Sequence, residues 1–297
     1  IHLKGDVDVT GVSTFAGNIS AHGNIIGDDS TNISGINSVT ATEYYGTGGI
    51  GSKLFVQDSQ NNLKAGFRSG IAITTGEVIA QRNVLIGYDA GRRMCCGCHN
   101  VLIGDNVLNR IHRGRYNVMM GVNVGSAFTQ DATVTSNVFI GRCVAISQQA
   151  NVSNSIAIGH GAAKNGTSNS SIIMGPNAGI GVLGQSHSQN IFLGTNAGTS
   201  ISTGNTNIAI GNGAGRCLCQ GDLNIYLGQN AGKCNFRGDC NIALGSHALY
   251  GANSGQMVAG RAHANIALGV NAGYSLSTGD QNFLVGTSAG YGLLAGS

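Results

Sequence analysis

Cysteine and histidine side chains gather in the segment MCCGCHN, which holds Cys95, Cys96, Cys98 and His99. His112 follows Cys95 at the spacing of a repeat that runs through the chain. Thiolate and imidazole groups are ligands that zinc prefers, so this segment is a candidate metal site. Adjacent cysteines do not have zinc-site spacing, however, and free surface thiols or disulfide bonds explain the same residues. We predict no metal and no cofactor, and leave free thiols and disulfides as alternatives.

Catalytic chemistry has little support elsewhere in the chain. The segments GNGAG and GHGAAK are similar to phosphate-binding loops, but they recur at one turn of a repeat and no helix follows them. The eight histidines have no carboxylate partner in the sequence, and no Ser–His–Asp spacing is present. We therefore predict that the protein is not an enzyme and assign no catalytic residue.

The composition excludes several classes of protein. The 297 residues include 49 glycines, one proline and no tryptophan, and only 10% are charged. This much glycine destabilises helical bundles, and collagen would need regular glycine and abundant proline. A hydrophobic content of 41% argues against disorder. The net charge of +3 gives no argument for nucleic acid, and no stretch of about 20 apolar residues predicts membrane insertion.

A repeated pattern, Asn–apolar–apolar–apolar–Gly, runs through the chain from residue 83. Its twelve units begin at Asn83, Asn100, Asn117, Asn137, Ser155, Ser171, Asn190, Asn207, Asn224, Asn241, Asn265 and Asn282. The spacing between units is nearly constant, the fifth position is always glycine, and the eighth is always small. The pattern predicts an all-β fold, a parallel β-roll or β-solenoid of twelve coils with about 17 residues each.

Each unit indicates two short strands and two turns. The first strand is the apolar run, and the first-position asparagines are expected to stack into a ladder. A second strand, with one wet face, is expected about eight residues later. Its apolar centres are Met94, Ile111, Phe128, Val182, Ile201, Leu218, Leu276 and Leu293. Stacking of successive units also places Cys217 beside Cys234.

The first strand is apolar on both faces, because its second to fourth residues are all apolar. We expect the second and fourth positions to fill the roll and the third to form an outer stripe. The predicted stripe is Leu85, Leu102, Met119, Phe139, Ala157, Ile173, Phe192, Ala209, Tyr226, Ala243, Ala267 and Leu284. A stripe about 58 Å long exceeds what monomers expose, so it predicts a trimer interface in a homotrimer.

The repeats resemble two known families. NIAIGNGAG, SIAIGHGAA and NIALGVNAG are similar to the head repeats of trimeric autotransporter adhesins, which implies a left-handed trimeric β-roll. NIALGSHALYGANSG resembles repeats of phage tail fibres and related surface proteins that end in a self-cleaving chaperone. GDVDVTGVSTFAGNISAHGNIIGD and TNISGINSVTATEYYGTG resemble shaft segments of tail fibres from marine cyanobacterial phages. The heptad stalk and membrane anchor of the autotransporters are not seen.

These observations predict three parts. Residues 1–50 form a fibrous β shaft of intertwined chains, residues 51–82 a collar, and residues 83–297 the β-roll. The expected function is a structural tail-fibre protein of a phage virion that contributes to host attachment. Its expected partners are further copies of itself, other virion tail proteins and a host surface receptor such as a glycan. The alternative is the head of a trimeric adhesin on a bacterial cell surface. The sequence assigns no receptor-binding residue.

Overall fold

The computed structural model describes residues 56–73, 80–146, 151–251 and 262–295. None of these residues is helical, so among them there is also no helix that could span a membrane. All of these residues belong to one compact unit, Gly46–Ser297. The predicted shaft over residues 1–50 lies outside the described residues.

Within the described residues, one sheet of fourteen strands runs through this unit. In spatial order its strands are β1 (Val56–Gln57), β2 (Leu63–Ala65), β3 (Val84–Ile86), β4 (Val101–Asp105), β6 (Val118–Val122), β8 (Val138–Arg142), β10 (Ile156–Ile158), β12 (Ile172–Met174), β14 (Ile191–Leu193), β15 (Ile208–Ile210), β16 (Ile225–Leu227), β17 (Ile242–Leu244), β18 (Ile266–Leu268) and β19 (Phe283–Val285). Only β1 is antiparallel to its neighbour. From β2 onward, each strand pairs in parallel with the strand one coil further on, for example Ile208 with Ile225.

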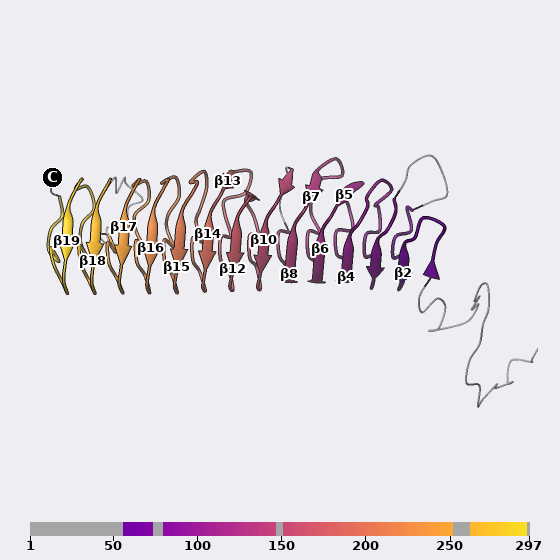
Figure 1. The fold of residues 1–297 in the computed structure, drawn as a ribbon, viewed down its shortest axis with the longest axis horizontal. Helices are drawn as coiled ribbons and strands as arrows, with labels where there is room; N and C mark the ends of the chain where they lie inside the picture. The colour runs from indigo at the N-terminus through magenta and orange to yellow at the C-terminus, as the bar shows by residue number, and fades with distance from the viewer. Residues whose placement is uncertain (1–55, 74–79, 147–150, 252–261, 296–297) are drawn as a thin grey trace, which may run out of the picture. The chain divides into compact units, whose positions relative to one another are not determined.

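This arrangement is a parallel β-solenoid, as Figure 1 shows for the row of strands from β2 to β19. About eleven turns of roughly 18 residues separate the first predicted unit from the last. The predicted all-β solenoid is therefore confirmed, and its mean turn is slightly longer than predicted because a few turns carry insertions.

The solenoid also begins earlier than the sequence indicated. β2 lies inside residues 51–82, the predicted collar, yet it pairs in parallel with β3. Asn62 before it accepts a hydrogen bond from Nδ2 of Asn83 at 2.8 Å, so it is the first member of the ladder. Lys64 occupies the third position of this coil, and its Nζ lies 3.0 Å from Oδ2 of Asp58. A paired charge thus takes the place of an apolar side chain where the stack ends.

The return half of each coil differs from the prediction. Short strands form there in five coils only, among the described residues, and they make two small parallel sheets. These are β5 (Arg113–Arg115), β7 (Thr133–Thr135) and β9 (Val152–Ser153), and β11 (Thr167–Asn169) with β13 (Ser186–Ser188). The predicted strand centres lie outside any strand; most, such as Met94, Ile111 and Leu218, are buried, whereas Val182 is exposed. The prediction of a second strand at those residues was wrong, because the chain turns there to close the coil.

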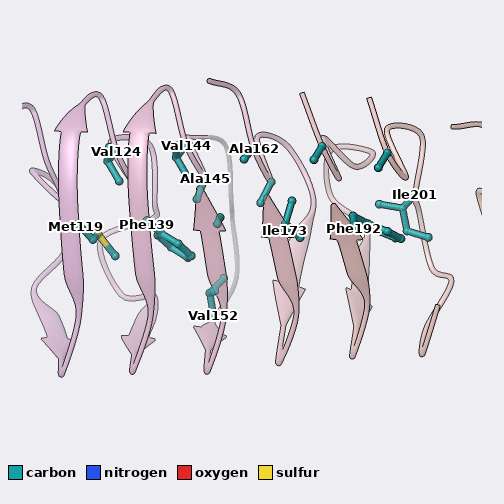
Figure 2. Packing of buried hydrophobic residues seen from close by; sticks show 14 of the residues in the cluster. Met119, Val124, Phe139, Val144, Ala145, Val152, Ala162, Ile173, Phe192 and Ile201 are labelled. Carbon is teal, nitrogen blue, oxygen red and sulfur yellow. The ribbon is translucent and has the colours of Figure 1, made fainter. Parts of the chain in front are cut away.

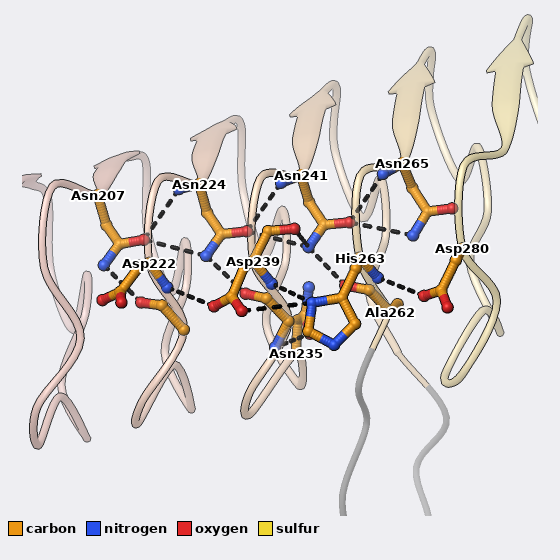
Figure 3. Close-up of polar contacts among 12 residues, drawn as sticks. Asn207, Asp222, Asn224, Asn235, Asp239, Asn241, Ala262, His263, Asn265 and Asp280 are labelled. Atoms are coloured by element: carbon orange, nitrogen blue, oxygen red, sulfur yellow. Dashed lines mark hydrogen bonds and ion pairs between the residues drawn. The ribbon is translucent and has the colours of Figure 1, made fainter.

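The first-position asparagines form the predicted ladder. The backbone N–H and the Nδ2 of Asn224 both donate to Oδ1 of Asn207 at 3.0 Å, and the same Nδ2 donates to the carbonyl oxygen of Gly238 at 2.7 Å. Asn241 donates to Oδ1 of Asn224 in the same way (Figure 3). At Ser155 the hydroxyl takes the place of the amide. Each rung therefore satisfies buried polar groups of the next.

A second ladder runs beside the first in the opposite sense (Figure 3). The backbone N–H of Asp222 donates to Oδ1 of Asp239 in the following coil at 2.8 Å. That of Asp239 donates to Nδ1 of His263 at 3.1 Å, and that of His263 donates to Oδ1 of Asp280 at 2.8 Å. Side chains at this turn thus hold the preceding coil, whereas the asparagines hold the following one.

The third-position residues lie inside the coil, which reverses the predicted faces. Side chains such as Met119, Phe139 and Phe192 point into the space between the strand and the return segment (Figure 2). The set is Leu85, Leu102, Met119, Phe139, Ala157, Ile173, Phe192, Ala209, Tyr226, Ala243, Ala267 and Leu284; the first eleven are fully buried, and Leu284 packs against this core at the last coil. The assignment of these residues to an outer trimer stripe was therefore wrong, since a single chain already buries them.

The narrow core explains the sizes of these side chains. Along the interior column, Phe192 and Tyr226 alternate with Ala209 and Ala243. A Cβ at Gly232 would lie 2.5 Å from Cδ1 of Tyr226, so this coil holds its tyrosine only because the facing residue is glycine. The alternation is local to these coils, because Leu85, Leu102, Met119 and Phe139 follow one another in the first coils.

We expect Asn224→Ala to lower the free energy of unfolding by about 2–4 kcal/mol, because it leaves the buried N–H of Asn241 without its acceptor. Asn212→Ala is the matched control, since Asn212 is exposed and outside the ladder. Thermal or urea unfolding of the two variants measures the difference. Equal stability of both would contradict a structural role for the ladder.

A buried histidine lies where serines interrupt the ladder. His187 is 1% exposed, and its Nδ1 lies 3.3 Å from Nδ2 of Asn190. Its Nε2 and the hydroxyl of Ser168, its partner in the β11–β13 pair, have no hydrogen-bond partner. Burial lowers the pKa of His187 to about 4. Val134 and Val152 fill the equivalent place in two earlier coils.

The free energy of unfolding should therefore fall in acid. Above pH 6.5 the imidazole is neutral in both states, and as the pH falls toward 4 the unfolded chain takes up the proton more readily. The full loss, on the order of 3 kcal/mol, is reached below the folded pKa. We expect His187→Val to remove this loss and His160→Gln, at an exposed histidine, to keep it. Parallel pH–stability curves for His187→Val and the unchanged protein would contradict the interpretation.

Candidate interaction face

The residues at the second and fourth positions of each repeat unit point out of the coil, because they alternate along the main strand with the buried third position. We call them the outer face. They are Val84, Ile86, Val101, Ile103, Val118, Met120, Val138, Ile140, Ile156, Ile158, Ile172, Met174, Ile191, Leu193, Ile208, Ile210, Ile225, Leu227, Ile242, Leu244, Ile266, Leu268, Phe283 and Val285. Every member is apolar, so the outer face is two unbroken apolar columns.

The side chains of the two apolar columns cover one another only in part and stay exposed to solvent. Met174 is 40% exposed and Ile210 is 38% exposed, although each has apolar neighbours in the coils on both sides. At the last coil, where one neighbour is missing, the exposure of Phe283 rises to 71%. The remaining exposure lies on the outward sides of the side chains, which only another molecule can cover.

The size of the outer face exceeds that of chance surface patches. Twelve strands spaced about 4.8 Å apart give a length of about 58 Å, and three residues with their side chains give a width of about 10 Å. The resulting area, on the order of 600 Å², is at the upper limit for a monomer and approaches the ~800 Å² that a standard interface buries on each partner. One flank carries mostly polar residues, such as Asn154, Gln189 and Gln281. An apolar centre beside a polar rim is typical of an interface.

The sequence held a signal for the correct orientation. Second and fourth positions are almost uniformly medium-sized residues such as Ile, Val and Leu, whereas third positions range from alanine to tyrosine. Such variation in size is expected in a confined interior, where each side chain must fit the residues packed around it. Strand alternation shows which positions share a face, and this variation indicates which face lies inside.

The side chains of the cysteine and histidine segment contact one another and residues of neighbouring coils. Cys95 Sγ lies 3.0 Å from Cys96 Sγ, and all eight cysteines of the chain are free thiols. The ring of His99 stacks on Tyr116, and His112 lies beside Gln130. Among the residues that the structure describes, no three Cys, His, Asp or Glu side chains are grouped so that they could hold a metal ion.

A group of exposed arginines lies on the return segments near these thiols. Arg93, Arg110, Arg113 and Arg115 are exposed, and no carboxylate of the described residues pairs with any of them. Arg113 and Arg115 flank the buried Gly114 on β5, so both guanidinium groups leave the same side of the strand. Sequence analysis missed this basic group because it considered only the net charge of the whole chain. A count of charges along the sequence would have found it.

Comparisons with protein-family models, with curated proteins and with solved structures found no match to this chain. The resemblance to tail-fibre and adhesin repeats therefore stays a prediction. The outer face and the solenoid that presents it are the features from which we infer a function.

Two pairs of substitutions distinguish the two faces of the main sheet. We expect Ile210→Glu with Leu227→Glu to keep the β-sheet signal in circular dichroism but to prevent association, since both side chains point outward. Ala209→Asp with Ala243→Asp should instead unfold the coils, because each carboxylate would be buried in the core of one chain. Light scattering reports the association. A folded, monomeric Ala209→Asp/Ala243→Asp variant would restore the original assignment of faces.

Proposed function

We propose that this chain is a structural fibre protein that assembles with two further copies of itself through the outer face. The single observation that carries the proposal is the uninterrupted apolar surface of twelve parallel strands. If association removes the outer face, on the order of 600 Å², from water, the gain at ~25 cal/mol per Å² is roughly 10–20 kcal/mol per chain. The entropy lost on association opposes this gain.

A second copy is the best match for this surface. The apolar side chains recur once per strand spacing along the whole stack, so a partner must repeat at the same distance to interdigitate with them. A copy of the same solenoid has this spacing at every coil, and cyclic symmetry closes the assembly. The threefold order follows the resemblance to trimeric head and tail-fibre repeats.

The proposed role is mechanical and not catalytic. Each coil depends on its neighbours through the parallel sheet and the first ladder, and many coils also through the second, so stability increases with the number of stacked coils. A rod of this kind suits the tail fibre of a phage virion, which holds an attachment site at a distance from the particle. In the trimer the return segments stay outside, and we propose that Arg93, Arg110, Arg113 and Arg115 contact anionic groups of host-surface glycans.

The assembly is tested by its mass. We expect the purified chain to have a solution mass of about 90 kDa, three times 30.1 kDa, and to keep the trimer position in detergent gels until it is boiled. The Ile210→Glu/Leu227→Glu variant is the control for specific association. A soluble, folded monomer of the unchanged protein would disprove the proposal.

Attachment is tested separately with the trimer. Labelled trimer should bind host cells, and changing the four arginines to glutamine should reduce binding, most strongly at low salt. Changing Arg216, Lys233 and Arg237 to glutamine is the matched control, because those charges lie many coils away. Equal binding by both variants would exclude the four arginines as the contact. It would not affect the proposal of a trimer, which the mass measurement tests.

A further inference from the structure

Cys217 and Cys234 occupy the same place in adjacent coils. Each lies ten residues after the asparagine of its own coil, and the backbone N–H of Cys217 donates to the carbonyl oxygen of Lys233 at 2.9 Å. This register places the two side chains beside each other, so that one thiol can donate to the other and shift their pKa values in opposite directions. One strand spacing, about 4.8 Å, falls within the Cα separation of about 4.4–6.8 Å that disulfide bonds require.

We propose that Cys217 and Cys234 are a redox-active dithiol, which low-molecular-weight disulfides of the glutathione class oxidise to a bond that joins two adjacent coils. The pair lies on the return segment and not on the outer face, so the proposal is independent of trimer assembly. Both residues are half-buried. Each keeps an accessible part that a small reagent can reach.

The Cys234 thiol, with smaller contributions from two positive charges, favours the thiolate of Cys217. The hydrogen bond from the Cys234 thiol, together with Arg216 and Lys233, lowers the pKa of Cys217, although partial burial opposes the shift. Lys233 is held in place, since its Nζ lies 2.9 Å from the hydroxyl of Tyr250 and 4.9 Å from the centre of that ring. The same hydrogen bond raises the pKa of Cys234, which therefore keeps its proton longer. The two thiols are thus a nucleophile and a resolving group.

Stacked rings and a glycine define the surroundings of the pair. Tyr250 stacks on Tyr274 at 4.8 Å between ring centres, which supports the side of the site that holds Lys233. In the coil after Cys234 the equivalent residue is Gly251, where a Cβ would lie 3.0 Å from Cβ of Cys234. At this place in successive coils, Cys234 therefore lies between Cys217 and a glycine. Only Cys217 offers it a neighbouring side chain.

The chemistry balances in two exchange steps. The Cys217 thiolate attacks one sulfur of the small disulfide, the S–S bond breaks, and one small thiolate leaves. Cys234 then loses its proton to solvent and attacks Sγ of Cys217, which releases the second small thiolate. The protein loses two electrons and two protons, and the small disulfide is reduced to two thiols.

The other cysteines do not offer this arrangement. Cys95 and Cys96 are adjacent in one coil, so a bond between them would join no two coils, and burial raises the pKa of Cys95. Cys143 and Cys240 have no cysteine in the same column of a neighbouring coil. They are the matched controls.

The test exposes the full-length protein to oxidised glutathione, blocks remaining thiols by alkylation, and maps the peptides by mass spectrometry. We expect a Cys217–Cys234 cross-link that has lost two hydrogens, a higher thermal midpoint, and reversal by a reductant. Cys234→Ser should trap glutathione on Cys217, whereas Cys217→Ser should prevent both reactions. Cys143→Ser and Cys240→Ser should change neither.

The order of reaction is tested with the pH profile of Cys217 alkylation. We expect its midpoint at least one pH unit below the ~8.5 of an ordinary thiol, and an upward shift in Lys233→Met, with unchanged circular dichroism. Separate alkylation of both cysteines after exposure to oxidised glutathione would overturn the proposal. An unshifted midpoint in Lys233→Met would overturn the assigned role of that charge.

Discussion

Hydrogen bonding between successive coils is the interaction on which the rest of this structure depends. A coil of about 18 residues is too small to bury a core or satisfy its own backbone, so it exists only in a stack. The asparagine ladder makes the dependence specific, because each Oδ1 accepts both a backbone and a side-chain N–H from the next coil. The ladder of Asp222, Asp239 and Asp280 acts in the opposite direction. The coils that carry both ladders are thus held from both sides.

This repetition determines what the surface can do. Because the strands are parallel and in register, any residue type that recurs in the repeat becomes a column along the stack. The apolar columns of the outer face, the aromatic stack of Tyr250, Tyr274 and Tyr291, and the pair Cys217–Cys234 all arise in this way. Sites in such a molecule are made by stacking residues from different coils and not by enclosing a pocket.

The proposed functions use different sides of each coil. The main sheet presents the outer face, which suits another copy of the chain, and the return segments carry the exposed arginines and the thiol pair. Trimer assembly would therefore leave the arginines and the thiols accessible. A cross-coil disulfide would add a covalent link parallel to the ladders, at a place where the coils are otherwise joined by hydrogen bonds alone.

The sequence by itself determined the repeat, the parallel solenoid and the asparagine ladder, since each follows from which residues recur and at what spacing. It also placed Cys217 beside Cys234. It did not determine which face of the main strand lies inside, because strand alternation separates the third position from the second and fourth without orienting either. Nor did it indicate that the solenoid begins at Asn62, where Lys64 breaks the apolar pattern. Tertiary structure decided both: the direction in which the chain curves encloses the third-position side chains, and pairing of β2 with β3 extends the stack despite the charge.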